Sequence, residues 1–201
     1  MNSRPRILVV AATVQELISF EDGDPPFIPC ACGVGPVDAA VHTTRVLAEH
    51  RPTHVLHVGI AGARRSSQLS AGTVVIGSRS VYQDLGVDDR FAPSVLLPDT
   101  RLLSLARAAL PEAPVVEIGT SGRVGGTHTC PVEAMEGFAV LRACAAADVP
   151  AIEIRIISND IEETDRTRWH FAEAFAATHT VTRALVREIS RSAWYETPVS
   201  A

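Results

Sequence analysis

The sequence predicts an α/β fold, in which a sheet carries helices on both faces. Apolar runs of strand length recur along the chain, segments of helix length follow them, and short connections join the two. The 201 residues show no internal repeat and no interdomain linker, so we expect a single domain over 1–201. A chain of this length can bury about 70% of its unfolded surface.

The first predicted elements are two strands and a helix. Residues 7–12 and 27–32 are apolar runs of buried-strand length. The turn Gly33-Val34-Gly35-Pro36 leads into a helix that reaches about Glu49, because proline suits the first helical position. Two arginines precede the first run, as in a signal peptide, but the run passes directly into Gln15-Glu16-Leu17, which favours a buried strand.

Two further strands are predicted before the middle of the chain. Arg51-Pro52 ends the first helix, and residues 53–58 form the next strand. It leads to the turn Gly59-Ile60-Ala61-Gly62, where absent side chains would let a ligand approach the backbone. Residues 72–82 are rich in β-branched side chains and predict a strand, whereas 84–98 read as irregular.

The second half alternates between helix and strand. Helices are predicted over 101–110 and 131–147, and strands over 114–120 and 151–158. A last helix is predicted over 166–192, either continuous or interrupted near 178–180, where β-branched residues crowd. The tail after Trp194 is expected to fray.

Charge and composition exclude several classes of function. The net charge of −5 argues against nucleic acid or an anionic membrane as the main partner. All 18 basic residues are arginines, so mechanisms that need a Schiff-base or phosphate-loop lysine are excluded. No apolar run approaches the ~20 residues needed to cross a bilayer.

Cysteine and histidine patterns give no sign of a metal site or of disulfides. The Cys-x-Cys at Cys30 and Cys32 has no matching second pair, and Cys130 and Cys144 lie in or beside apolar segments. His54 and His57 are three apart on a strand and so face opposite sides. We therefore expect four buried thiols, no metal, no cofactor and a cytoplasmic location.

Polar residues follow three of the predicted strands. Glu16, the turn at 59–62 and Ser158-Asn159 each come just after a strand, where α/β sheets bind ligands. Glu136 lies near a helix start. Simpler interpretations stay open: either glutamate can be a solvated helix-start acid, and Asn159-Asp160 a turn. The residues alone thus predict an α/β enzyme with a carboxylate-bearing pocket.

Five ordered motifs make the chain similar to a known family. They resemble the nucleoside phosphorylase superfamily, in the hydrolase branch that holds the methylthioadenosine/S-adenosylhomocysteine nucleosidases. Within that branch, the resemblance is greatest to the futalosine hydrolases of the alternative menaquinone pathway. It implies a three-layer fold with a mixed central sheet flanked by helices. The motifs are Ala11-Ala12-x-x-x-Glu16, Gly33-Val34-Gly35-Pro36-Val37-x-Ala39-Ala40, Gly59-Ile60-Ala61-Gly62-Ala63, Glu133-Ala134-Met135-Glu136-Gly137, and Val149-Pro150 through Ser158-Asn159.

The resemblance implies hydrolysis of the N-glycosidic bond of a purine nucleoside through an oxocarbenium-like sugar. Glu16 matches the water-activating acid of the family, and Glu136 matches its ribose-binding glutamate, with Met135 beneath the sugar. Trp169 falls where the nucleosidases carry an aromatic lid, although core packing is an equal alternative. Three further residues match substrate-contact positions: Val34, Ala61 and Gly62.

Departures from the family pattern predict the nucleophile and the base. Bacterial phosphorylases carry Arg and Ser where this chain has His57 and Ile60, so water is the expected attacker rather than phosphate. Asn159 replaces an aspartate that adenine-specific nucleosidases carry. An amide cannot donate that proton, but it can accept from a protonated N7 and donate to a 6-oxo group. This favours futalosine, cleaved to hypoxanthine and dehypoxanthine futalosine.

Two other functions stay open, an adenosine-type nucleosidase and a non-catalytic nucleoside-binding protein. The resemblance also implies a homo-oligomer, most simply a dimer, in which residues 84–98 reach a neighbour's site. The 5′ carboxylate of futalosine needs a cation, for which Arg64, Arg79 and Arg123 are the candidates.

Overall fold

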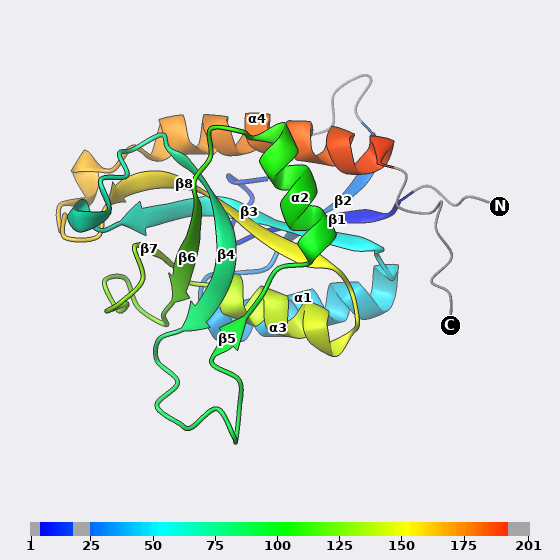
Figure 1. The fold of residues 1–201 in the computed structure, drawn as a ribbon, viewed down its shortest axis with the longest axis horizontal. Coiled ribbons are helices and arrows are strands. Elements are labelled where there is room, and N and C mark those ends of the chain that lie inside the picture. The colour runs from blue at the N-terminus through cyan, green and yellow to red at the C-terminus, as the bar shows by residue number, and fades with distance from the viewer. Residues whose placement is uncertain (1–4, 18–24, 193–201) are drawn as a thin grey trace.

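An eight-stranded mixed sheet lies between two pairs of helices (Figure 1). The computed structural model describes residues 5–17 and 25–192. Its strands are β1 (Ile7–Ala11), β2 (Phe27–Ala31), β3 (His54–Ala63), β4 (Val74–Tyr82), β5 (Val95–Leu96), β6 (Val115–Thr120), β7 (Val132–Ala134) and β8 (Ala151–Asp160). Its helices are α1 (Pro36–His50), α2 (Thr100–Ala109), α3 (Gly137–Ala146) and α4 (Phe171–Arg191), with short 3-10 turns at Arg65–Ser67 and Arg166–Arg168.

The pairing of the strands brings several strand ends to one edge. The strand order is β2-β1-β3-β7-β6-β4-β5, and β8 pairs with both β3 and β4. Strands β3, β7, β6, β4 and β8 therefore close into a ring of pairings. Because β1, β3 and β8 run parallel to one another, their carboxyl ends meet at the same edge, where α/β sheets bind ligands.

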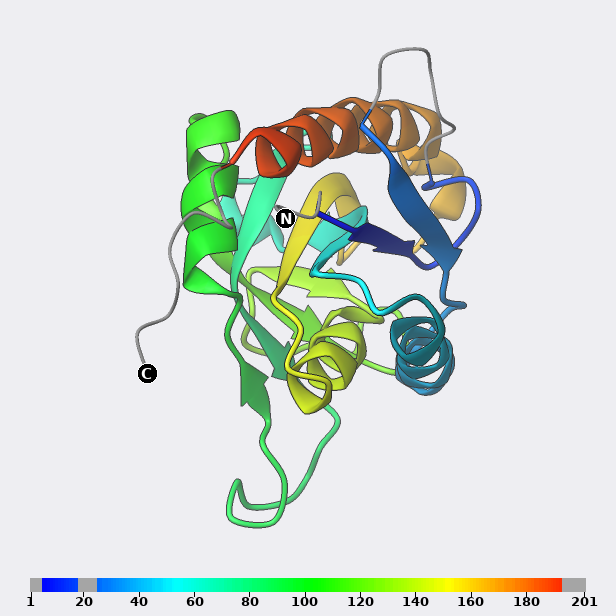
Figure 2. The same cartoon turned by 90° about the vertical axis from the view of Figure 1, so that its right-hand side faces the viewer.

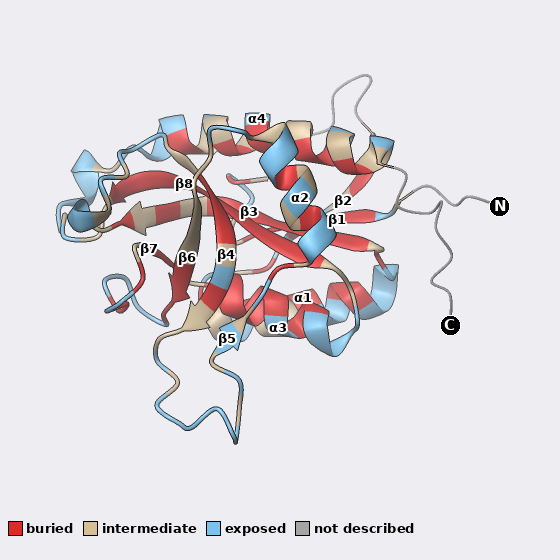
Figure 3. Cartoon of the chain, viewed as in Figure 1, coloured by how far each residue is buried: buried red, intermediate tan, exposed pale blue. Residues whose placement is uncertain are grey.

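Helices cover both faces of the sheet, with α2 and α4 on one side and α1 and α3 on the other (Figures 1 and 2). Strand β1 is apolar throughout because both of its faces are covered. Ile7 and Val9 pack in the core cluster that includes residues of α2 and α4, whereas Leu8 and Val10 pack in the cluster under α1 and α3. The strands are thus mostly buried between half-exposed helices (Figure 3). The predicted fold class is confirmed.

Two predicted element boundaries are wrong at the edge of the ring. Residues 59–62 are not a turn, because β3 continues to Ala63 by pairing with β7 and β8. The predicted helix over 131–147 begins only at Gly137, since residues 132–134 form β7 between β3 and β6. Short strands held by two neighbours lack a periodicity that the sequence alone reveals.

The last helix also differs from its prediction. Residues 166–168 form a separate 3-10 turn, and α4 begins at Phe171 and runs without interruption. The hydroxyls of Thr178 and Thr182 bond to the carbonyls four residues earlier, so these β-branched residues lie within a regular helix. The short strand β5 lies in the region 84–98 that was predicted to be irregular. The tail after Trp194 lies outside the described residues.

The four cysteines are free and buried, as predicted. Among the described residues, none of the helices is long and apolar enough to span a membrane.

Candidate active site

A cavity of about 430 Å³ opens at the edge where the carboxyl ends of β1, β3 and β8 meet. All eight residues predicted for the site line this one cavity, namely Glu16, Val34, Ala61, Gly62, Met135, Glu136, Asn159 and Trp169. Sequence segments far apart in the chain thus converge on one place.

Glu16 is held from two sides on the loop that follows β1. Its Oε2 accepts hydrogen bonds from the backbone amide and the hydroxyl of Thr13, both at 2.9 Å. Its Oε1 accepts from the amide of Ile60 on β3, at 3.0 Å. The side chain is only 4% exposed, so Glu16 is a buried, oriented carboxylate rather than a solvated helix-start acid.

Glu136 occupies the N-cap position of α3, yet its side chain does not cap that helix. Its Oε1 instead accepts from the amide of Gly35, just before α1, at 3.0 Å. Burial raises the pKa of Glu136 above 4.5, whereas the charge of Arg155 and the Gly35 amide lower it and the charges of Glu16 and Glu153 raise it further. This carboxylate therefore faces the cavity in a poorly solvated setting.

A buried ion cluster lies behind these two carboxylates, and its residues are not among those predicted for the site. Arg155 on β8 is 1% exposed, and its Nε donates to Oε1 of Glu153 at 2.9 Å. Its Nη2 lies 3.6 Å from Oε2 of Glu136 and also donates to Nε2 of His57. Burial and the charge of Arg155 hold the pKa of His57 well below 6.5, so the ring is neutral and accepts this bond.

One signal could have revealed the cluster from the sequence. Glu153 and Arg155 alternate along β8 with three isoleucines, and such alternation places both charges on one face of a strand. A charged pair two apart inside a buried strand needs partners on its neighbours. Because the surrounding residues are apolar, the segment was predicted only as a buried strand, and its charged pair was not recognised as part of the site.

Gly59 leaves room for Glu16 and Arg155 to approach each other. A Cβ at this position would lie 2.5 Å from Nη1 of Arg155 and 2.6 Å from Oε1 of Glu16. The predicted reason for the glycines at 59–62 was access for a ligand to the backbone. At Gly59 the structure shows a different reason, which is space for two charged side chains.

The amide of Asn159 lies near the end of β8. Its Oδ1 accepts from the hydroxyl of Ser158, and its Nδ2 donates to the carbonyl of Asp160, each at 2.8 Å. Nδ2 would lie 3.1 Å from a Cβ at Gly62, so glycine there lets the amide sit against β3. Asn159 is 7% exposed and is thus a fixed polar group in the cavity wall.

An aromatic wall faces these polar groups. Its rings belong to Trp169, Phe171 and Phe175, which all line the cavity. Nε1 of Trp169 donates to the carbonyl of Glu163 at 3.1 Å, and the ring lies 5.4 Å from that of Phe171. Trp169 is half-buried and borders the cavity, so it does not serve only to pack the last helix.

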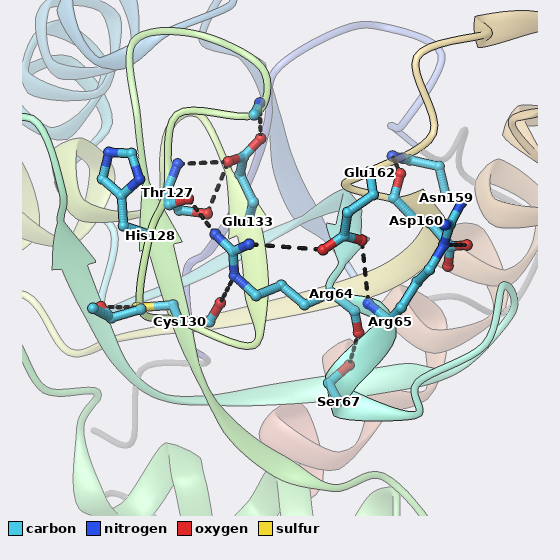
Figure 4. Close-up of polar contacts among 12 residues, drawn as sticks. Arg64, Arg65, Ser67, Thr127, His128, Cys130, Glu133, Asn159, Asp160 and Glu162 are labelled. Atoms are coloured by element: carbon cyan, nitrogen blue, oxygen red, sulfur yellow. Dashed lines mark hydrogen bonds and ion pairs between the residues drawn. The ribbon is translucent and has the colours of Figure 1, made fainter.

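The loop between β6 and β7 is pinned by Glu133 and Arg64 (Figure 4). Glu133 accepts from the amide and the hydroxyl of Thr127, both at 2.8 Å, and Arg64 donates to the carbonyls of Thr127 and Cys130. Arg79 pairs with Glu117. None of the three arginines expected to bind a substrate carboxylate, Arg64, Arg79 and Arg123, lines the cavity.

Comparison with known proteins places the chain in a family. Residues 14–191 match the model of the phosphorylase superfamily, and the chain belongs to that superfamily. It is 33% identical over 172 residues to a futalosine hydrolase of Streptomyces coelicolor, covering 73% of each chain. It is 27% identical over 189 residues to a futalosine hydrolase of Thermus thermophilus, covering 81% of this chain and 82% of that one.

A solved structure supports the fold. A methylthioadenosine/S-adenosylhomocysteine nucleosidase of Colwellia psychrerythraea in complex with adenine superposes with a TM-score of 0.79. The match covers 93% of this chain and 96% of that one, at 18% identity.

Proposed function

We propose that this protein hydrolyses the N-glycosidic bond of a purine nucleoside, with futalosine as its substrate and hypoxanthine as the released base. The observation that carries the proposal is that two buried carboxylates, Glu16 and Glu136, line one cavity together with the amide of Asn159. The similarity to two futalosine hydrolases supports the choice of substrate.

The two carboxylates suit the two halves of the reaction. As the bond between C1′ and the base breaks, the base takes the electron pair and positive charge develops on the ribose. Glu136 accepts hydrogen bonds from the ribose hydroxyls and stabilises that charge, most strongly in the transition state. Glu16 takes a proton from water while the water oxygen bonds to C1′.

Water rather than phosphate is the proposed nucleophile. His57 and Ile60 stand at the positions where bacterial phosphorylases carry phosphate-binding side chains, and His57 is neutral. The nearby guanidinium of Arg155 is engaged by Glu153, Glu136 and His57. A phosphate dianion beside Glu16 would meet buried carboxylates and a guanidinium that is already paired, whereas a neutral water needs no cation.

The leaving base is read by Asn159. Solvent water supplies the proton that the departing base takes up at N7, and the amide of Asn159 accepts from that N–H and donates to the 6-oxo group of hypoxanthine. We place Met135 beneath the ribose and Val34, Ala61, Gly62 and Trp169 around the bound nucleoside, because all of them line the cavity.

A panel of nucleosides tests this proposal. The protein is incubated with futalosine, inosine, adenosine and methylthioadenosine, with and without phosphate, and the released base and sugar are identified by chromatography. We expect hypoxanthine and a free sugar from futalosine at a rate independent of phosphate. Sugar 1-phosphate that forms only with phosphate would contradict the hydrolase. A preference for methylthioadenosine would favour the adenosine-type nucleosidase, and binding without base release would favour a nucleoside-binding protein.

We also propose that the protein acts in the cytoplasm, in menaquinone biosynthesis. We propose further that it forms a homo-oligomer, most simply a dimer. The segment between β4 and β5 projects from the sheet (Figures 1 and 3) and exposes apolar side chains, with Phe91 at 81% and Val87 at 51%. Sedimentation at micromolar concentration checks the assembly, and a monomer there would contradict it.

A further inference from the structure

The charges that line the cavity are divided between its interior and its rim. Three glutamates, Glu16, Glu133 and Glu136, line it, and all three are buried. Arg166 is the only cationic residue of the lining within the described part of the chain, and it is exposed. The guanidinium therefore lies at the rim, while the carboxylates lie inside.

The acidic residues close to Arg166 in the sequence are engaged elsewhere. Asp165 accepts from the amide and the hydroxyl of Thr167, at 3.0 and 2.7 Å, and Glu163 pairs with Arg168 at 3.0 Å. Asp160 and Glu162 pair with Arg65 and Arg64 (Figure 4). Arg166 forms no ion pair with any described residue, so its charge is available to a ligand.

Aromatic rings lead from Arg166 into the cavity. Cζ of Arg166 lies 5.6 Å from the centre of the Trp169 ring, and the rings of Phe171 and Phe175 follow at centroid spacings of 5.4 and 6.1 Å. One turn after Phe175, Nε2 of His179 lies 3.0 Å from the carbonyl of Gln15, the residue next to Glu16. The wall thus connects the cationic rim with the loop that carries Glu16.

We propose that Arg166 determines specificity by binding a carboxylate on the 5′ substituent of the nucleoside. This inference rests on the proposed function, because it assumes the base at Asn159 and the ribose hydroxyls at Glu136. With the base and the ribose hydroxyls so engaged, we assign the 5′ substituent to the remaining part of the lining, the aromatic wall next to Arg166.

The chemistry of the wall defines the substituent. A carboxylate is repelled by the buried glutamates but forms two parallel hydrogen bonds with a guanidinium. The atoms between ribose and carboxylate pack against the aromatic rings, so an apolar or aromatic spacer fits best. We therefore assign the carboxylate of the proposed substrate, futalosine, to Arg166, and the spacer before it to the rings of Trp169 and Phe171.

Matched substrates and variants test the role of Arg166. The substrates are futalosine and its neutral methyl ester, and the variants are Arg166→Gln, Arg166→Lys and, as a control, Arg142→Gln. Arg142 is exposed on α3 and does not line the cavity, and Arg168 is left unchanged because it engages Glu163. We expect Arg166→Gln to lower kcat/KM for futalosine roughly ten- to hundredfold, mainly through KM, and to change kcat/KM for the ester less than about twofold.

The two remaining variants test whether the effect depends on the charge at position 166. Arg166→Lys should recover part of the activity on futalosine, because it keeps the charge but not the planar fork. Arg142→Gln should behave as the wild type. Equal losses on acid and ester, or no loss on futalosine, would overturn the proposal.

A binding experiment separates this inference from the proposed function. Calorimetry in the Glu16→Gln background compares the affinities for futalosine and its ester with and without Arg166→Gln. A preference for the acid that disappears with Arg166→Gln supports the carboxylate site even if the wild type releases no base, in which case only the hydrolase proposal fails. Base release without a preference for futalosine over its ester would contradict the carboxylate site but would leave the hydrolase proposal intact.

Discussion

Nη2 of Arg155 lies 3.6 Å from Oε2 of Glu136, and the two side chains are only 1% and 5% exposed. A charge buried this deeply is costly unless it is paired, so Arg155 stabilises the ionised form of the carboxylate that faces the cavity. Because Arg155 also bonds to Glu153 and His57, the position of Glu136 depends on residues that do not line the cavity.

Each cavity carboxylate should be essential for turnover. Glu16→Gln removes the proposed general base, and Glu136→Gln removes the charge that faces the oxocarbenium-like ribose. Each change should lower kcat by at least two to three orders of magnitude, in keeping with the typical size of these effects (roughly 10²–10⁴). Glu49→Gln, on an exposed site of α1, serves as the control. Circular dichroism should show a folded protein, and near-full activity of Glu16→Gln would contradict its role.

Gly59→Ala should damage activity through side chains that the new methyl group displaces. The Cβ of the alanine would lie 2.5 Å from Nη1 of Arg155 and 2.6 Å from Oε1 of Glu16, so these side chains would have to move. A displacement on the scale of 1 Å in a catalytic group can lower the rate roughly a hundredfold. The matched control is Gly72→Ala, because Gly72 also has a positive φ, 87° against 155° at Gly59, but a Cβ there meets nothing within 4 Å. Steady-state kinetics should show the loss only for Gly59→Ala.

The residues that line the cavity could be predicted from the sequence better than the buried residues that hold them in place. Glu16 and Asn159 could be found because each follows a predicted strand at the edge where ligands bind, and all three residues, Glu136 included, stand in a family motif. Arg155 and Glu153 stand in the same strand as Asn159, but their role depends on which strands lie beside β8. That pairing joins residues about a hundred positions apart, such as His57 and Arg155, and no local pattern reports it.

The same limit explains the misplaced boundaries. Residues 59–62 contain two glycines and read as a turn, but β7 and β8 supply pairing partners on both sides. Arg166 was overlooked because its exposure and its position in a 3-10 turn give no signal in the sequence. Its importance arises from the side chains around the cavity rim.

The dependence of activity on pH should report Glu136. Its pKa is raised above 4.5, chiefly by burial, and only the ionised form stabilises the ribose cation. With a neutral substrate such as inosine, kcat/KM should therefore fall as the pH drops through that raised pKa. Glu153→Gln removes a negative charge that raises this pKa, while its amide oxygen can still accept from Arg155. The decrease of kcat/KM at acid pH should therefore shift to lower pH in this variant. A decrease that stays at the same pH or shifts to higher pH would contradict an electrostatic effect of Glu153 on Glu136.

Asn159→Asp should change which base is released. In the wild type, Nδ2 donates to the carbonyl of Asp160 at 2.8 Å, so an ionised aspartate would place two acceptors together there. Towards a 6-oxopurine, the carboxylate also faces O6 and leaves an acceptor unpaired. An unmatched buried polar pair costs about 1–3 kcal/mol, which corresponds to a roughly ten- to hundredfold loss of kcat/KM on futalosine.

The same substitution should help a 6-aminopurine. The crowding of acceptors favours a protonated aspartate, which can donate to N7 while its other oxygen accepts from the 6-amino group. Activity on methylthioadenosine should therefore rise relative to futalosine, as measured by the ratio of adenine to hypoxanthine released from an equimolar mixture. Asn159→Ala is the control, since it removes the amide without adding a proton donor and should lower both activities. If the wild type prefers methylthioadenosine and Asn159→Asp leaves that preference unchanged, both the base assignment and the choice of futalosine fail.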